Sequence, residues 1–199
     1  SDELLSKSRA FAAPGARPAR TPPMANREAL LRPQSRLAER LQAAQAETRR
    51  AAFLAVECAG QGLLFPLASA GEIFAVPTLL PVPHTQPWFT GVANLRGGLH
   101  GVVDLAAFLG LRPPRAPSEP LRDGARLLSL NAALGSHCAL LVDRLAGLRN
   151  EEQLNAMPAT GAAKPSFAGQ RWRDGSGREW QEIDLAALAG HPQFLGIAT

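Results

Sequence analysis

The sequence has few of the residues that hold metal ions. It contains 2 cysteines and 4 histidines in 199 residues, and neither cysteine belongs to a CxxC pair. Structural zinc sites are built from clustered cysteine and histidine ligands at short spacings, so a metal site is not expected. Cys58 and Cys138 lie instead in apolar, strand-like runs. This placement predicts two buried, reduced thiols.

The motifs of common enzyme classes are missing as well. The chain has no GxGxxG or GxxxxGK phosphate-binding loop, no HExxH zinc motif and no GxSxG nucleophile motif. His100 and His137 fall in predicted strands, where we expect hydrogen-bonded structural histidines. Asp104 and Asp184 resemble a pair of catalytic acids, but each also stands where a helix cap is predicted. An enzyme that uses Asp104 or His100 is therefore the least favoured hypothesis, and no cofactor is expected.

The folded part of the chain has almost no net charge. Residues 1–50 carry 10 basic and 5 acidic side chains, whereas residues 51–199 carry 11 and 12. The basic character thus lies in the N-terminal region. A domain that binds nucleic acid normally presents a basic face of its own, so this distribution disfavours that class.

No stretch of the sequence predicts a membrane anchor or a secretory signal. Residues 73–95 lack Lys, Arg, Asp and Glu, but four prolines interrupt them, at Pro77, Pro81, Pro83 and Pro87. Prolines at that density exclude a continuous membrane-spanning helix. Residues 1–23 have no apolar core of the kind found in secretory signals. We therefore expect a cytoplasmic protein without direct membrane insertion.

The first 50 residues differ in composition from the rest. Residues 1–25 are predicted to be disordered, as an upstream extension or a cloning remnant, because Met24 opens a sequence that resembles a natural start. Residues 26–50 predict a helix with one narrow apolar stripe, although Pro33 either kinks it or marks a later start. That stripe packs against the chain's own domain or against a partner helix.

The remainder, residues 51–199, predicts a mainly β domain. Short apolar runs separated by turns predict strands over 53–58, 63–67, 92–95, 99–103, 126–131, 137–142, 167–172 and 178–183. Residues 68–73 suggest a short helix or a tight bend. Residues 111–124 contain four prolines and predict a surface loop, and residues 149–166 predict an irregular crossover.

The chain is organised around residues 88–110. Two strands, 92–95 and 99–103, flank a predicted hairpin turn at Gly97-Gly98, since glycine adopts positive φ without a Cβ clash. Asp104 then predicts the N-cap of a short helix that ends near Gly110. Arg96 is the one charge at the hairpin tip. A solvated turn arginine and a recognition residue are both compatible with this position.

An internal repeat supports a two-part architecture. The segment 103–110, VDLAAFLG, matches 183–190, IDLAALAG, at an offset of 80 residues, and each copy follows a glycine-containing hairpin. This match indicates either two related β units, each closed by a capped helix, or a chance similarity between alanine- and leucine-rich segments. Short strands at close spacing without long helices favour small barrels over a parallel sheet.

The sequence resembles the CheW-like domain family of chemotaxis coupling proteins. The resemblance rests on GVANLRG at 91–97 followed by VVDL at 102–105, on AGEI at 70–73, on LLVD at 140–143 and on IDL at 183–185. The longer motifs WFTGVANLRGG and GVVDLAAFLG, together with the predicted N-terminal helix, are most similar to the PilI branch, which serves type IV pilus twitching motility. The resemblance implies two intertwined five-stranded barrels with a hydrophobic groove between them.

The resemblance also implies a function. It predicts a non-catalytic adaptor whose partners are the cytoplasmic tip of a methyl-accepting chemoreceptor and a CheA-type histidine kinase. The implied contact residues are Ala70, Glu72, Ile73, Leu95, Arg96, Gly97, Val142 and Asp143. The alternative is a small barrel that binds single-stranded nucleic acid, since barrels of this size do so.

Overall fold

The structure is a computed structural model that describes residues 36, 38–43, 45–46 and 52–199. The described residues before 52 are all helical, in agreement with part of the helix predicted over 26–50. The predicted extension over 1–25 and the rest of that helix lie outside the described residues. Residues up to Ala43 form a unit of their own, and the second unit, from Ala44 onward, contains both sheets.

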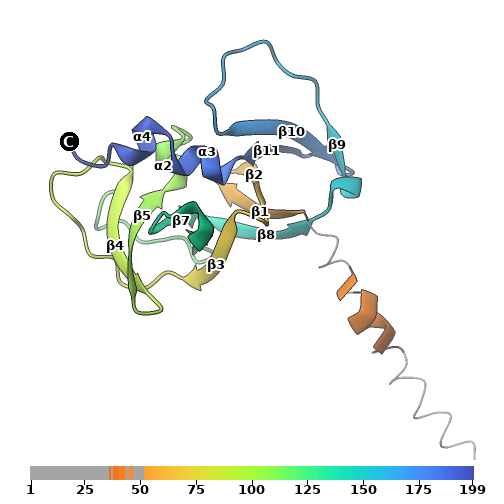
Figure 1. Ribbon diagram of the computed structural model, residues 1–199, viewed down its shortest axis with the longest axis horizontal. Helices are drawn as coiled ribbons and strands as arrows, with labels where there is room; N and C mark the ends of the chain where they lie inside the picture. Colours follow the sequence, from red (N-terminus) through yellow and green to blue (C-terminus); the bar gives the residue numbers. More distant parts are fainter. Residues whose placement is uncertain (1–35, 37, 44, 47–51) are drawn as a thin grey trace, which may run out of the picture. The chain divides into compact units, whose positions relative to one another are not determined.

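The strands form two antiparallel-rich sheets (Figure 1). The first sheet has the order β8 (Arg144–Arg149), β1 (Phe53–Cys58), β2 (Gln61–Pro66), β11 (Glu179–Ile183), β10 (Ala168–Asp174) and β9 (Leu154–Ala156). The second has the order β3 (Ala70–Ala75), β6 (Arg126–Leu130), β7 (Cys138–Val142), β5 (Gly98–Asp104) and β4 (Phe89–Leu95). The chain begins in the first sheet, builds the second, and returns, which confirms the mainly β, intertwined architecture.

The first sheet has six strands, whereas the resemblance implies five. The sequence pattern predicts four of the six and misses β8 and β9. β9 lies in the segment predicted as an irregular crossover, and β8 had no predicted structure. β8 is held by its pairing with β1, whose register shifts between Ala55 and Val56 opposite Gly147, a residue with φ of 94°. A bulged edge strand of this kind depends on its neighbour rather than on its own residues.

The structure decides between a short helix and a tight bend for residues 68–73. They contain a turn followed by the start of β3, rather than a short helix. Gly71 and Glu72 have low strand propensity, but the Glu72 backbone N–H donates to Ser129 Oγ on β6 at 2.9 Å. Pairing with β6 therefore decides the conformation of this segment.

The first sheet curls on itself. β8 and β9 lie at its opposite edges, yet residues 150–153 alone connect them. Four residues span at most about 14 Å, so the two edges must approach each other. The connection contains the 3₁₀ helix η2 (Glu151–Gln153), which Asn150 and Gln153 close with a capping box.

The core has three parts. One cluster lies inside the first sheet and includes Trp180, and another lies inside the second sheet and includes Leu141. The largest cluster combines residues of β1 and β2 with residues of β5, β6 and β7, and with the short helices. The two sheets therefore share one apolar interior, whose fully buried members include Val56, Cys58, Phe65, Val103, Leu105, Leu128, Leu140, Val142, Leu185 and Leu188.

The internal repeat corresponds to a structural repeat. β5 leads into α2 (Leu105–Phe108), and β11 leads into α3 (Leu185–Ala189). Asp104 and Asp184 cap these helices with nearly identical φ and ψ, −70° and 101° against −72° and 103°. Each carboxylate accepts a hydrogen bond from the backbone three residues later, as predicted. All these helices are short, and none in the described part of the chain is long and apolar enough to cross a bilayer.

The C-terminal segment returns to the second sheet. After α3, the helix α4 (Pro192–Leu195) buries Phe194 among aromatic side chains. Phe194 lies 5.5 Å from Phe108 and 6.5 Å from Trp88 between ring centroids. Beyond α4, the Gln86 backbone N–H donates to the carbonyl of Ile197 at 2.7 Å. This aromatic cluster joins α2 to the end of the chain.

Candidate partner-binding surface

The eight residues implied as contacts fall into three groups. Three lie on β3, three lie at the end of β4 and in the following turn, and two lie at the end of β7 and directly after it. β3 and β4 are the opposite edges of the second sheet. The structure brings the first two groups together through Glu72 and Arg96, whereas the two residues of the third group are buried.

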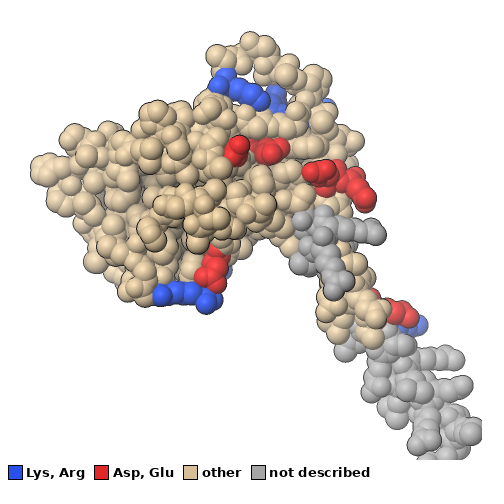
Figure 2. Space-filling model, viewed as in Figure 1, with Lys and Arg blue, Asp and Glu red and all other residues tan. Residues whose placement is uncertain are grey.

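An ion pair joins the two edges of the second sheet. Arg96 Nη2 lies 2.9 Å from Glu72 Oε1, so this sheet is curled like the first. Figure 2 shows an acidic and a basic side chain against each other at this place, over β3 and the β4–β5 hairpin. The two side chains are 75% and 53% exposed, and such a pair contributes about 0–1 kcal/mol to stability. Both groups are therefore accessible to another molecule.

The hairpin turn consists of Arg96 and Gly97, one residue earlier than predicted. Leu95 pairs with Gly98, and the two residues between them have φ of 51° and 81°. Positive φ at both central positions defines a type I′ turn, in which the first position normally holds Asn, Asp or Gly. The Asn94 side chain steadies the turn by accepting the Gly97 N–H at 2.8 Å.

Arg96 is consequently held in an unfavourable backbone conformation. A left-handed conformation costs a residue with a Cβ about 1–2 kcal/mol relative to the right-handed one. The exposed pair with Glu72 does not clearly offset this cost. Backbone strain at an exposed residue on a rigid hairpin is typical of residues kept for recognition.

Two exposed apolar residues stand close to the charged pair in the sequence. Ile73 on β3 is 43% exposed, and Leu99, two residues beyond the turn, is 64% exposed. The surface therefore offers a cation, an anion and two aliphatic side chains from two strand edges. Mixed surfaces of this kind, with an arginine beside apolar groups, are common in protein–protein interfaces.

Not all of the implied contact residues are exposed. Leu95 and Val142 are 4% and 0% exposed, because strand alternation directs both side chains into the core. Ala70 is half-buried against the largest cluster. In this structure the side chains of Leu95 and Val142 are not accessible at the surface.

Gly91, in the first strand of the hairpin, lies against the backbone of Leu80. Its φ is 130°, and a Cβ at this position would lie 2.2 Å from the carbonyl oxygen of Leu80. That carbonyl accepts the Val92 N–H at 2.8 Å, and the Leu80 N–H donates back to Val92 at 2.9 Å. The close approach covers the outer edge of β4 and leaves the hairpin tip as its accessible end.

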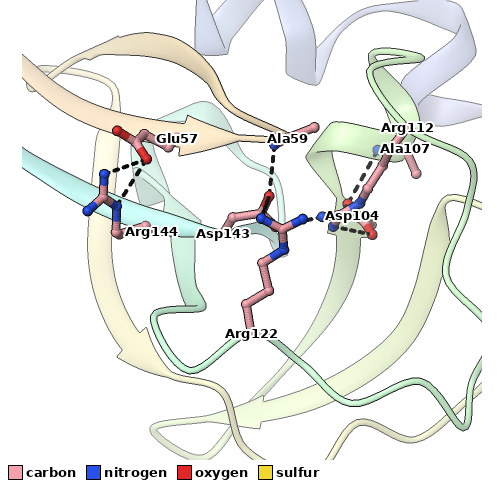
Figure 3. A network of polar contacts seen from close by, with 8 residues as sticks. All are labelled: Glu57, Ala59, Asp104, Ala107, Arg112, Arg122, Asp143 and Arg144. Carbon is pink, nitrogen blue, oxygen red and sulfur yellow. Dashed lines mark hydrogen bonds and ion pairs between the residues drawn. The ribbon is translucent and has the colours of Figure 1, made fainter.

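Asp143 lies in a buried polar network (Figure 3). It is 8% exposed, and its carboxylate accepts the Ala59 backbone N–H at 2.8 Å and Arg112 Nη1 at 2.7 Å. Arg112 Nη2 lies 2.9 Å from both oxygens of Asp104. One guanidinium thus binds two carboxylates that are remote in sequence.

The sequence predicted neither this network nor the role of Arg112. Residues 111–124 form a loop as predicted, but Arg112 enters the interior, where its side chain is 16% exposed. The adjacent Arg144 does not pair with Asp143 and binds Glu57 instead, at 2.7 Å. The available signal was two acidic residues at the ends of apolar strands, since a buried carboxylate needs a cation or several donors.

The network keeps Arg112 charged. Burial opposes the charged guanidinium, but hydrogen bonds to Asp104 and Asp143 outweigh it and raise the pKa of Arg112 above its ordinary value. Near the network, Glu57 binds both Arg144 and Arg178. Burial acts to raise the pKa of Glu57, and the hydrogen bonds from these arginines lower it overall.

The described residues contain no group of three or more His, Cys, Asp or Glu side chains that could hold a metal ion. His100 and His137 lie with their ring centroids 5.9 Å apart, and His100 Nδ1 donates to the Gly98 carbonyl at 3.0 Å. Both cysteines are free; Cys58 is buried and Cys138 is half-buried. Burial raises the pKa of Cys58 to about 12, so this thiol is unreactive at neutral pH.

A cleft of about 370 Å³ lies between the first sheet and the residues that follow α2. It is lined by Gln61, Gly62, Leu63, Leu109, Leu111, Phe167, Trp180 and Ile183, among others. The family resemblance implies a receptor-binding groove between the two halves of the domain, but none of the eight implied contact residues lines this cleft.

Comparison with known proteins decides the family. A family profile described as "CheW-like domain" matches residues 52–193, which contain both sheets and the network around Arg112. The chain belongs to the CheW-like domain family. This membership confirms the resemblance found in the motifs at 70–73, 91–105 and 140–143.

Two known proteins are similar to this chain, one in sequence and one in structure. The chain is 30% identical over 169 residues to "Protein PilI" of Pseudomonas aeruginosa, an alignment that covers 82% of this chain and 89% of that protein. Its structure is similar to the crystal structure of the scaffolding protein TtCheW from Thermoanaerobacter tengcongensis. That comparison has a TM-score of 0.55 and 17% identity, and covers 67% of this chain and 88% of the other. The CheW-like domain therefore shares the fold of TtCheW.

Proposed function

We propose that this CheW-like domain protein is a non-catalytic cytoplasmic adaptor. It couples the tip of a methyl-accepting chemoreceptor to a CheA-type histidine kinase, within signalling that controls type IV pilus twitching motility. The family membership supports the adaptor class, and the likeness to Protein PilI over most of both chains supports the pilus branch.

The placement of Arg96 is the observation that carries the proposal. Arg96 is exposed, strained and paired with an exposed carboxylate at the tip of a rigid hairpin. For folding alone, Asn or Gly at this position is more favourable. An arginine here is explained by a partner that accepts its guanidinium.

Binding measurements test the proposal. The chain would be titrated by calorimetry with the receptor tip and, separately, with the kinase of the same organism. Arg96→Asn keeps the turn and removes the cation. It is expected to weaken at least one of the two interactions by about tenfold or more, as for truncated interface arginines.

Arg173→Asn serves as the matched control. Arg173 lies on β10 and is 51% exposed, and it pairs with Glu179 at 2.9 Å. Its loss should leave unchanged the interaction that Arg96→Asn weakens, because Arg173 lies in the other sheet. Equal affinities of the wild type and Arg96→Asn for both partners would contradict the assignment of Arg96.

The distribution of charge opposes the nucleic-acid alternative. Several arginines of the described part of the chain are already paired with carboxylates, among them Arg96, Arg112, Arg144, Arg171, Arg173 and Arg178. A nucleic-acid surface needs cations free to bind phosphates. No comparison favours that alternative, and we do not propose it.

A further inference from the structure

The chain returns from the second sheet to the first through a single residue. β7, the last strand of the second sheet along the chain, ends at Val142, and β8 of the first sheet begins at Arg144. Asp143 is the one residue between them. Its backbone N–H donates to the Glu57 carbonyl on β1 at 3.0 Å, so the crossing is held against the first sheet.

The Asp143 side chain contacts both halves of the domain. One oxygen accepts the N–H of Ala59, in the β1–β2 turn of the first sheet. The other accepts Arg112 Nη1, and the same guanidinium binds Asp104 at the end of β5, in the second sheet (Figure 3). A continuous chain of charge-assisted hydrogen bonds therefore connects the two sheets.

Arginine is suited to this connection. Its guanidinium is planar and presents several N–H donors in fixed directions, so two carboxylates bound to it have a fixed relative position. The apolar core that the sheets share is strong but non-directional. Pro113 and Pro114 follow Arg112 directly and restrict the backbone of its loop.

We propose that Arg112 is a positioning residue that fixes the angle between the two sheets. This proposal rests on the proposed function, because an adaptor that binds two partners must present their surfaces in a defined relation. Arg112 acts through Asp104 and Asp143 rather than by touching either partner. Its loss changes how the two surfaces work together rather than either surface alone.

Distance measurements between the sheets test the structural part. Spin labels would be placed at Leu99→Cys on β5 and Leu148→Cys on β8, which are exposed positions on the two sheets. Cys138→Ala removes the half-buried thiol, and Cys58 stays unlabelled because it is buried with a raised pKa. Pulsed electron–electron double resonance then reports the distribution of distances.

Arg112→Gln is expected to broaden or shift the distribution. Arg122→Gln is the matched control, because Arg122 lies in the same loop, is 67% exposed and approaches Asp143 only to 4.0 Å. It should leave the distribution as in the wild type. An unchanged distribution in Arg112→Gln overturns the proposal.

A second variant guards against simple unfolding. The triple change Arg112→Met, Asp104→Asn, Asp143→Asn removes all three charges, while both amides keep an oxygen for the N–H groups of Ala107 and Ala59. Neutral replacement of a buried ionic group is often tolerated. This folded variant should also show a broadened or shifted distribution, and a wild-type distribution overturns the proposal.

Signalling output tests the functional part. Arg112→Gln, which leaves all eight implied contact residues intact, would be assayed for binding to each partner alone and for control of kinase phosphorylation by the receptor. Separate affinities should be unchanged, whereas receptor control should fall by about tenfold, within the usual range of coupling between sites. Unchanged receptor control despite an altered distance distribution overturns the positioning role. If the wild type binds neither partner, the proposed function fails, and the distance measurement still decides whether Arg112 fixes the angle between the sheets.

Discussion

Two segments of this molecule have nearly the same sequence and the same local structure, but different surroundings. Residues 103–110 and 183–190 each end a strand, cap a short helix with an aspartate and close with a glycine. Asp104 is 1% exposed, whereas Asp184 is exposed. The first also binds Arg112, whereas the hydrogen bond to Ala187 is the one described contact of the second carboxylate.

The difference teaches that a local motif fixes a cap but not its tertiary role. Eight residues after each cap, the first segment has Arg112 and the second has Pro192. The arginine enters the junction between the sheets, and the proline begins α4, which buries Phe194 in the aromatic cluster. The first copy of the repeat is thus followed by an arginine that hydrogen-bonds between the two sheets, and the second by a helix that packs in the apolar core.

The largest expected effect comes from removing the buried cap. Asp104→Ala leaves Arg112 without its principal partner in the interior, and breaking a buried ion pair in this way costs about 3–5 kcal/mol. Asp184→Ala removes only an exposed cap, which costs about 1 kcal/mol. Urea denaturation of both variants measures the difference. Equal losses would show that the Arg112 network adds nothing to the cap.

The two hairpins before these helices offer a second contrast. Gly91→Ala places a Cβ 2.2 Å from the Leu80 carbonyl oxygen at a φ of 130°, which is expected to cost about 3 kcal/mol. Gly177→Ala, in the β10–β11 turn, has open space and a φ of 86°, and should cost only about 1 kcal/mol. Thermal unfolding of the two variants decides. A loss at Gly177 as large as that at Gly91 contradicts the proposed close contact.

The two hairpins also share a polar residue near the end of the first strand. At an offset of 80, Asn94 corresponds to Asp174, and each side chain accepts backbone N–H groups of its own turn. Hydrogen bonds from Ser176 and Trp180 lower the pKa of Asp174 to about 2, although burial acts in the opposite direction. The second hairpin is therefore the acid-sensitive one, since an amide does not titrate in this range.

This asymmetry predicts a pH dependence. A carboxyl group with a lowered pKa in the folded state stabilises the protein above about pH 4, and the contribution is lost as the pH falls towards 2. After allowance for solvent screening, Asp174→Asn should cost on the order of 1 kcal/mol at pH 7 and nothing near pH 2. Stability measured from pH 7 to pH 2 tests this. A difference that does not shrink in acid contradicts it.

The smallest expected effect on stability concerns the hairpin turns themselves. Arg96 has positive φ in the first turn, whereas in the second turn the residue with positive φ is Gly177, which corresponds to Gly97 at the offset of 80. Arg96→Asn should therefore leave the stability unchanged or raise it by up to about 1 kcal/mol, while it weakens partner binding. Unfolding and binding measured on the same samples reveal the trade-off. A clear loss of stability would show that the pair with Glu72 is structural.

Much of this architecture could be predicted from local sequence. The hairpin over 92–103, both aspartate caps and most strands rely on turn residues, capping residues and alternation, which act over a few positions. The family motif GVANLRG is equally local. Accordingly, the family and the mainly β, intertwined fold were both predicted correctly.

The rest depends on contacts between distant residues. β3 and β8 have weak strand sequences, and their pairing with β6 and β1 gives them their conformation. Arg112 lies in a proline-rich loop whose composition predicts exposure, and only the folded chain brings it between Asp104 and Asp143. Burial is likewise set by the folded chain, and it leaves Leu95 and Val142, two of the residues implied by the motifs, with side chains in the core.

Reconstitution of receptor-controlled phosphorylation tests the proposed adaptor role most directly. Receptor, kinase and this chain would be combined, and kinase autophosphorylation measured with and without receptor ligand, for the wild type and Arg96→Asn. An adaptor role predicts that phosphorylation responds to the receptor only when the wild-type chain is present, and that Arg96→Asn loses most of this response. A kinase that responds equally without the chain, or equally with both forms of it, would contradict that role.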